Sequence, residues 1–175
     1  MSEIHVGVKF EVVHGPEEAI RDPRIDELIR IGKELAAKGF CPENCGNLSF
    51  RVPGGFVITP VCAALGNLTP GDFVLVKEVD IVTKRVVCAG KVKPSSESMM
   101  HKMIYDARPD IQVILHAHAL DLKNAITTKK AYPYGTLEFA QSAVEILKDH
   151  DLVILKGHGF VSVGKTTAEA FERIF

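Results

Sequence analysis

The stretch DIQVILHAHAL, residues 110–120, leads a short apolar run directly into two histidines that stand one residue apart. Such a run is typical of a buried strand. Side chains two positions apart lie on the same face of a strand, so His116 and His118 are predicted to project together while Ala117 faces away. The stretch therefore predicts an interior strand that ends in a pair of imidazoles.

Helical and strand patterns alternate on both sides of this strand. Helices are predicted over residues 22–40, 95–108, 136–150 and 166–175. Strands are predicted over residues 47–52, 55–60, 72–80, 85–90, 111–116, 151–159 and 160–164. Several of these strands follow one another through short glycine-containing turns, which is typical of hairpins. The sequence therefore predicts an α/β fold with a mixed, largely antiparallel sheet that is covered by helices.

The composition is that of an ordinary globular protein. The chain has 175 residues, of which 46% are hydrophobic and 25% charged, and its formal net charge is −1. A chain of this length can form one core, so residues 1–175 are expected to be a single domain. No basic stripe indicates a nucleic-acid surface, and no apolar run approaches the ~20 residues that cross a bilayer. The first 15 residues lack the pattern of a secretory signal, so a cytoplasmic protein is expected.

The four cysteines, at positions 41, 45, 62 and 88, are unevenly spaced. In a chain without an export signal, this spacing does not favour a disulfide framework. Cys41 and Cys45 have the spacing of half a structural zinc site, but no second close pair follows them. A structural zinc site built from cysteines is therefore disfavoured.

A third histidine could complete a metal site with His116 and His118. His158 follows another apolar run, and the flanking Gly157 and Gly159 allow a sharp turn that aims its side chain. Three neutral imidazoles, each about 2.0–2.1 Å from a zinc ion, leave a coordination position open, as in catalytic sites. The same residues are also compatible with two hydrogen-bonded histidines and a turn residue. The remaining histidines are expected on the surface or on helix faces: His5, His14, His101 and His150.

The segment KPSSES carries a candidate base and candidate anion ligands. Ser95 and Ser96 lie at a predicted helix N-terminus, where backbone N–H groups attract anions, and one of them is expected to cap the helix. Glu97 either complements the helix dipole or, beside a metal site, acts as a general base, and His101 one turn later could support it. Asn47, in CGNLSFR, could donate its amide to an anion or serve as a turn residue.

Together these segments resemble the class II aldolase/adducin family, in its fuculose-1-phosphate aldolase-like group. The matching segments follow the family's order and span residues 46–171: GNLSFR, ITP, KPSSE, RPDIQVILHAHA and GHGFVSVGKTTAEAF. The resemblance implies a three-layer α/β/α sandwich that assembles as a homotetramer with active sites between subunits. It implies a zinc ion, or another divalent metal such as Mn2+ or Co2+, bound by residues matching His116, His118 and His158. It implies phosphate contacts from residues matching Asn47, Thr59, Ser95 and Ser96.

The resemblance also implies the chemistry. The implied function is a metal-dependent lyase (aldolase) that cleaves or forms a C–C bond in a small sugar phosphate through a zinc-stabilised enediolate. Glu97 is then a metal ligand at rest and the proton carrier in the reaction. Related 4-epimerases usually carry Asp at this position, so the glutamate favours the aldolase branch. A sugar-phosphate dehydratase and a 4-epimerase stay open as alternatives, and Cys41 or Cys62 near the site would favour the dehydratase. A non-catalytic adducin-like scaffold would lack the three histidines.

Three features depart from the family pattern. The segment after ITP reads VCAALGNL, where family aldolases continue with a small residue and glycine. The region that carries a catalytic tyrosine in the fuculose enzyme is shorter here, and Tyr132 and Tyr134 are the nearest substitutes. The last helix is expected to be truncated at Phe175, whereas family aldolases continue into a segment that lends a residue to a neighbouring active site. The second acid/base residue is therefore unassigned.

Overall fold

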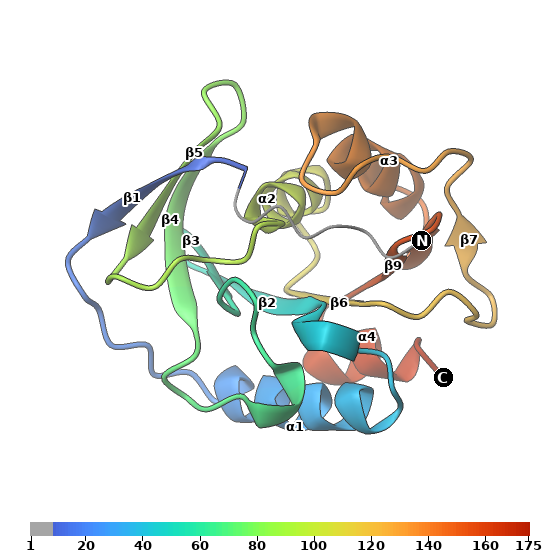
Figure 1. Cartoon of the computed structure of the whole chain (residues 1–175), viewed down its shortest axis with the longest axis horizontal. Coiled ribbons are helices and arrows are strands. Elements are labelled where there is room, and N and C mark those ends of the chain that lie inside the picture. Colours follow the sequence, from blue (N-terminus) through green and yellow to red (C-terminus); the bar gives the residue numbers. More distant parts are fainter. Residues whose placement is uncertain (1–8) are drawn as a thin grey trace.

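The fold is a three-layer α/β/α sandwich, as the family resemblance implies. In the computed structural model, which describes residues 9–175, one nine-stranded sheet lies between two pairs of helices (Figure 1). The helices are α1 (Arg24–Ala37), α2 (Ser98–Ala107), α3 (Leu137–Leu147) and α4 (Thr167–Glu172). The strands are β1 (Glu11–Gly15), β2 (Asn47–Val52), β3 (Gly55–Ile58), β4 (Val74–Asp80), β5 (Arg85–Ala89), β6 (Val113–Ala117), β7 (Ile126–Thr127), β8 (Leu152–Leu155) and β9 (Gly159–Gly164).

The sheet is mixed and largely antiparallel, which confirms the prediction from the hairpin pattern. Its strand order is β1-β5-β4-β3-β2-β6-β9-β8-β7. Among the described strands, only the edge pairs β1–β5 and β7–β8 are parallel. The sequence does not predict β1 and β7, because β7 has two residues and both strands pair with segments distant in the chain.

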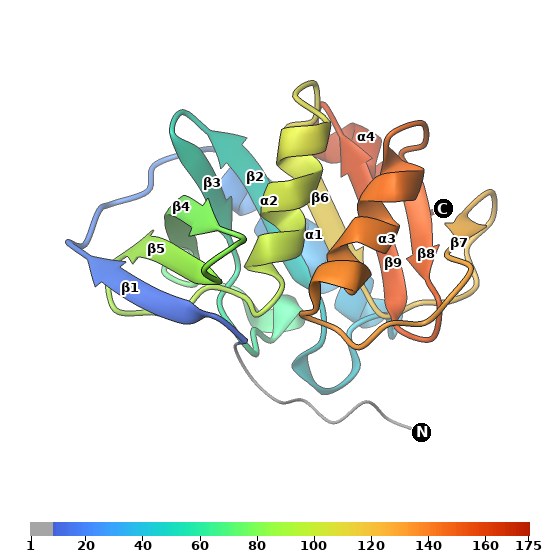
Figure 2. The same cartoon turned by 90° about the horizontal axis from the view of Figure 1, so that it is seen from above.

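Alternation along β6 sorts its side chains between the two helical layers. Val113, Leu115 and Ala117 pack with α1 and α4, whereas Ile114 packs with α2 and α3. Figure 2 shows α2 and α3 in front of the sheet and α1 behind it. All of β6 is buried, so the predicted interior strand is confirmed. The same alternation directs His116 towards the layer of α2 and α3.

Helix α2 begins later than predicted. Its first residue is Ser98, its N-cap position is Glu97, and no side chain caps it. The expectation that Ser95 or Ser96 caps this helix is wrong, because a cap directly precedes the first helical residue. Instead, the Ser98 N–H donates to the Ser95 carbonyl oxygen at 3.1 Å, and the Glu97 N–H donates to the Ser95 hydroxyl at 3.3 Å. This turn fixes Glu97 at the entrance to the helix.

Candidate metal centre

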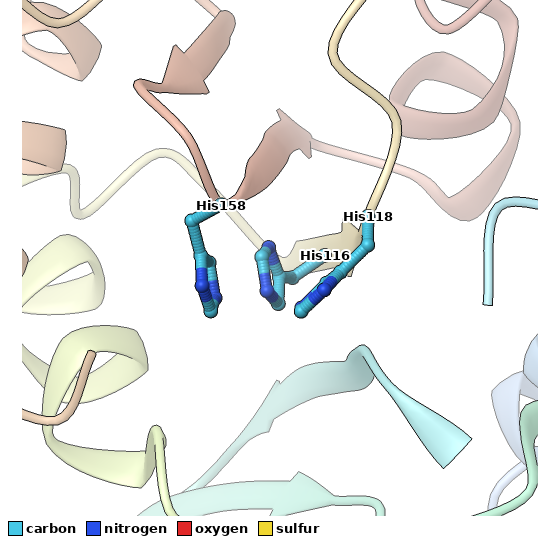
Figure 3. Close-up of side chains that lie close together, drawn as sticks. All are labelled: His116, His118 and His158. Carbon is cyan, nitrogen blue, oxygen red and sulfur yellow. The ribbon is translucent and has the colours of Figure 1, made fainter. Parts of the chain in front are cut away.

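Three imidazoles converge at one end of the central strands (Figure 3). His116 lies on β6, His118 directly follows that strand, and His158 lies in the turn between β8 and β9. The ring centroids are 5.2 Å apart for His116 and His118, 5.1 Å for His116 and His158, and 4.3 Å for His118 and His158. The nitrogens that could bind a metal all lie within 4.8 Å of one another. The two strand ends thus bring the three histidines to one point.

Close backbone packing brings His158 to the end of β6. Strands β6 and β9 pair in antiparallel fashion, with Ala117 opposite Phe160. The turn that enters β9 is closed by a hydrogen bond from the His158 N–H to the Leu155 carbonyl oxygen at 2.9 Å. A Cβ atom on Gly159 would lie 2.3 Å from the carbonyl oxygen of Ala117. Glycine is therefore needed here, because any side chain would push β9 away from β6.

We expect Gly159→Ala to weaken both the fold and metal binding. The added methyl group must displace the backbone of Ala117, and overpacking of this kind costs about 1–3 kcal/mol. Because His158 directly precedes Gly159, this displacement would also move its imidazole, so Zn2+ affinity should fall about tenfold or more in a calorimetric titration. Gly71→Ala is the control, since the nearest atom to its Cβ is the Thr69 Oγ1 at 3.8 Å. Wild-type Zn2+ affinity in Gly159→Ala would contradict this packing explanation.

The His116 ring is held in one orientation by the backbone. Its Nδ1 lies 2.6 Å from the carbonyl oxygen of Phe160, and the side chain is fully buried. A carbonyl oxygen only accepts hydrogen bonds, so Nδ1 carries the proton and Nε2 bears the lone pair of the neutral ring. The Nε2 atom lies 3.2 Å from Oε2 of Glu97. Two electron-rich atoms at this distance are stabilised by a cation or proton between them, so the pair fits a metal site.

Glu97 is a buried carboxylate beside these histidines. Its Oε1 lies 3.1 Å from Nε2 of His158, and its Oε2 accepts a hydrogen bond from Nδ2 of Asn47 at 2.6 Å. Burial alone raises the pKa of Glu97, but His116 and His158, when they are protonated, lower it through their charges, and the hydrogen bonds from His158 and Asn47 lower it further. The pKa of Glu97 therefore lies well below its usual range. At neutral pH this side chain is a carboxylate that accepts hydrogen bonds and does not donate them.

His118 is neutral in this environment. Burial is the main cause that lowers its pKa to about 3; His116 and His158, when they are protonated, add to the effect, and Glu97 opposes it. A neutral imidazole is the form that binds metals. Three imidazole nitrogens with one carboxylate nearby form a donor set that suits zinc and similar borderline cations.

The cluster opens into a pocket of about 250 Å³. His118, His158 and Glu97 line it, together with three of the four predicted phosphate ligands, Asn47, Ser95 and Ser96. Thr59 is not among the lining residues, because it is fully buried and its hydroxyl accepts a hydrogen bond from the Leu48 N–H at 3.1 Å. The pocket also has lining residues that the sequence does not single out: Glu43, Asn44, Gly46 and Pro60.

One tyrosine candidate, Tyr134, and one of the two cysteine candidates, Cys62, line this pocket. Tyr134 lines it and stacks on His158, with ring centroids 6.0 Å apart, whereas Tyr132 lines a separate cavity beside α3. Cys62 lines the pocket, and Cys41 is not among the lining residues. Within residues 9–175, the histidine triad is the group that could hold one ion, and the cysteines form no disulfide.

The other histidines are mostly placed as expected. His14 and His150 are exposed, and His5 lies outside the described residues. His101, on α2, is fully buried, and its Nε2 lies 2.6 Å from Oδ1 of Asn47. The spacing of four residues between Glu97 and His101 gives the sequence signal for this placement, but the contact through Asn47 depends on strand pairing.

We expect the metal-free protein to lose stability as the pH falls below about 6.5. Burial lowers the pKa of His101 from 6.5 to about 3. Between these pH values the unfolded chain binds a proton that the folded chain does not bind, so acid favours unfolding. Urea titrations from pH 7 to pH 4 should therefore show a falling free energy of unfolding. The slope should be shallower in His101→Gln, and an equal slope in both proteins would contradict this assignment.

The fold and the site define an α/β/α protein that carries a histidine triad and a buried carboxylate beside a pocket. No helix in the described part of the chain has the length and apolar character that crossing a membrane requires.

Comparison with known proteins shows the family. The model of the class II aldolase and adducin N-terminal domain matches residues 26–131 and 120–175. A protein of Methanococcus maripaludis named L-fuculose phosphate aldolase is 30% identical over 167 residues, covering 84% of this chain and 88% of the relative. A methylthioribulose-1-phosphate dehydratase of Pseudoalteromonas translucida is 28% identical over 179 residues, covering 83% of this chain and 82% of the relative. The solved structure of an L-fuculose 1-phosphate aldolase is 26% identical in sequence and has a TM-score of 0.73, covering 90% of this chain and 82% of its own. The chain belongs to the class II aldolase and adducin family.

Proposed function

We propose that this protein is a divalent-metal-dependent aldolase that cleaves or forms a C–C bond in a small sugar phosphate. The observation that carries the proposal is the buried Glu97 carboxylate, which lies between the Nε2 atoms of His116 and His158 beside the pocket. A base next to a metal-binding triad is what proton transfer beside a carbonyl group requires. The M. maripaludis relative, named L-fuculose phosphate aldolase, supports the same reaction class.

We assign zinc as the ion, with Mn2+ and Co2+ as alternatives, because three imidazole nitrogens are a common ligand set of catalytic zinc. His116, His118 and His158 would hold it. When bound, such an ion acts as a Lewis acid that stabilises negative charge on a substrate oxygen. The Phe160 carbonyl oxygen contributes by holding the His116 ring through Nδ1, so that Nε2 keeps its direction.

Glu97 would carry the proton in the reaction. Its Oε2 accepts the amide of Asn47 at 2.6 Å, whereas the contact of Oε1 with Nε2 of His158 is longer, at 3.1 Å, so Oε1 is the oxygen better placed to take and return a proton. At neutral pH the group is ionised, which is the form that accepts a proton. General acid–base catalysis of this kind typically accelerates a reaction about 100- to 10,000-fold.

Ser95 and Ser96 would bind the substrate phosphate. Both line the pocket in the turn that precedes α2, and a helix N-terminus attracts anions. Thr59 would act indirectly, because its carbonyl oxygen accepts a hydrogen bond from the Ser95 N–H at 3.1 Å. Asn47 could contact the phosphate only in competition with Glu97, which its amide already contacts.

The test is a panel of ketose 1-phosphates and 5-phosphates, including L-fuculose 1-phosphate, incubated with Zn2+-loaded protein. Formation of dihydroxyacetone phosphate together with a small aldehyde would identify an aldolase. Failure to cleave any member of the panel, with one Zn2+ bound per chain, would contradict the proposed reaction.

A dehydratase of the same family is the second candidate. Cys62 lines the pocket beside the phosphate-binding serines, and a methylthioribulose-1-phosphate dehydratase is among the relatives. The same panel separates the two reactions, because a dehydratase would release water without C–C cleavage. A 4-epimerase would instead return an isomeric ketose phosphate, and a non-catalytic scaffold would leave every substrate unchanged.

We also propose that the protein assembles as a homotetramer, in line with the family resemblance. Light scattering on the purified protein tests this directly. A mass close to four chains is expected, and a mass of one chain would contradict it.

A further inference from the structure

A chain of buried hydrogen bonds leads from Glu97 into the layer between the sheet and α2. Asn47 Nδ2 donates to Glu97 Oε2 at 2.6 Å, and Asn47 Oδ1 lies 2.6 Å from His101 Nε2. On the far side of the ring, His101 Nδ1 lies 2.7 Å from the Ser49 hydroxyl, which lies 2.8 Å from the Tyr105 hydroxyl. All five residues are buried, with 5% or less of each exposed. We call this set the Glu97 relay: Glu97, Asn47, His101, Ser49 and Tyr105.

Strand pairing and helix periodicity create the relay. Asn47 is the first residue of β2 and lies opposite His116 on β6, which brings its amide beside the triad. Ser49, two residues later, projects to the same face of the sheet. His101 and Tyr105 lie one and two helical turns after Glu97, so all three share one face of α2. The relay therefore joins the end of the sheet to the helix that carries the proposed base.

The direction of every hydrogen bond in the relay follows from the Glu97 carboxylate. Because Glu97 only accepts, Asn47 must present its NH2 group to Glu97 and its carbonyl oxygen to His101. His101 must then carry its proton on Nε2, and Nδ1 must accept from the Ser49 hydroxyl. The Ser49 oxygen in turn accepts from Tyr105. Each donor in the relay thus faces an acceptor, and reversing any link would leave two donors or two acceptors in contact.

His101 is separated from any substrate. It is fully buried and is not among the residues that line the pocket, whereas Asn47 and Glu97 both line it. An effect of His101 on a bound molecule must therefore pass through the Asn47 amide, whose orientation the Nε2 proton fixes.

We propose that His101 is a positioning residue that fixes the Asn47 side-chain amide and, through it, the orientation of the Glu97 carboxylate. The kinetic part of this inference rests on the proposed function, but the hydrogen-bond geometry does not. In the relay, Asn47 holds Oε2, and Oε1 stays directed towards His158 and the pocket. The main role of Asn47 would thus be to orient the Glu97 carboxylate, and its predicted contact with the substrate phosphate would be secondary.

Three substitutions of His101 separate positioning from folding. His101→Leu removes both ring nitrogens. His101→Gln can place its amide N–H where Nε2 lies and so keeps the donor to Asn47, whereas His101→Asn reaches the position of Nδ1 and keeps only the Ser49 contact. Ile104→Val, in the fully buried core on the same helix, is the control that lowers stability without touching the relay.

The first measurement is nitrogen-15 NMR of the metal-free protein, which needs no activity. His101 should show the Nε2–H tautomer. The Asn47 side-chain amide signals should shift in His101→Leu and return close to their wild-type positions in His101→Gln. An Nδ1–H tautomer at His101, or Asn47 signals unchanged in His101→Leu, would overturn the proposal.

The second measurement is steady-state kinetics with L-fuculose 1-phosphate or the best substrate of the panel, on protein with one Zn2+ per chain. In His101→Leu and His101→Asn, kcat should fall about 10- to 100-fold while KM changes little, and His101→Gln should recover most of the loss. Ile104→Val should keep the wild-type kcat. A wild-type kcat in folded, Zn2+-loaded His101→Leu would overturn the positioning role. If the wild type cleaves no substrate, the proposed function fails and the NMR measurement alone decides the relay.

Discussion

His118→Ala should lose both the bound divalent ion and the turnover of a sugar phosphate. His118 supplies one of three imidazoles whose ligand nitrogens lie within 4.8 Å of one another. Two imidazoles hold zinc far more weakly than three. Loss of a residue that only hydrogen-bonds to a metal ligand typically lowers metal affinity by roughly 10- to 100-fold, and loss of the ligand itself should lower Zn2+ affinity by more than that. Calorimetric titration with Zn2+ measures the affinity, and the ketose phosphate assay measures turnover.

His150→Ala is the matched control for this substitution. His150 is exposed and is not part of the histidine triad, so its loss should leave one Zn2+ per chain and the wild-type kcat. A His118→Ala protein that still binds one Zn2+ with wild-type affinity would show that the triad does not hold the ion.

Glu97→Gln should abolish turnover and keep the metal. Glutamine matches the shape of glutamate, and its carbonyl oxygen can still accept the Asn47 amide. It cannot take up a proton, so kcat should fall by about 100- to 10,000-fold. Zn2+ content should stay at one ion per chain, because the three imidazoles are unchanged. Metal analysis and kcat on the same preparation give both results.

Glu43→Gln is the control, because Glu43 is the other carboxylate that lines the pocket. Its loss should change kcat by less than about threefold if Glu97 is the proton carrier. Normal turnover in Glu97→Gln with loss of turnover in Glu43→Gln would transfer the role to Glu43.

The sequence predicts the fold well where its pattern is regular. Residues 111–116 are predicted as an interior strand, and the observed strand, β6, is wholly buried. The hairpins β2–β3, β4–β5 and β8–β9 follow from the strand patterns, and the turns of β2–β3 and β8–β9 also contain glycine. The sequence does not predict the edge strands β1 and β7, because both are defined by pairing with distant segments and have little hydrophobic pattern of their own.

The histidine triad is also foreseeable, but its surroundings are not. Placing His116 and His118 on one face needs only the period of a strand. The contact of Asn47 with Glu97 depends on the register that sets Asn47 opposite His116, and no local pattern encodes that register. The late start of α2 is set by the turn at Ser95, so helix-capping preferences alone misplace it.

The central claim is that His116, His118 and His158 together bind one divalent cation. The most direct test is a crystal structure of the purified protein with anomalous diffraction data on both sides of the zinc absorption edge. We expect one peak per chain, about 2.0–2.1 Å from one nitrogen of each of the three imidazoles. A structure of Zn2+-saturated protein with no peak there, with the peak at another site, or with His158 turned away from the pair would contradict the claim.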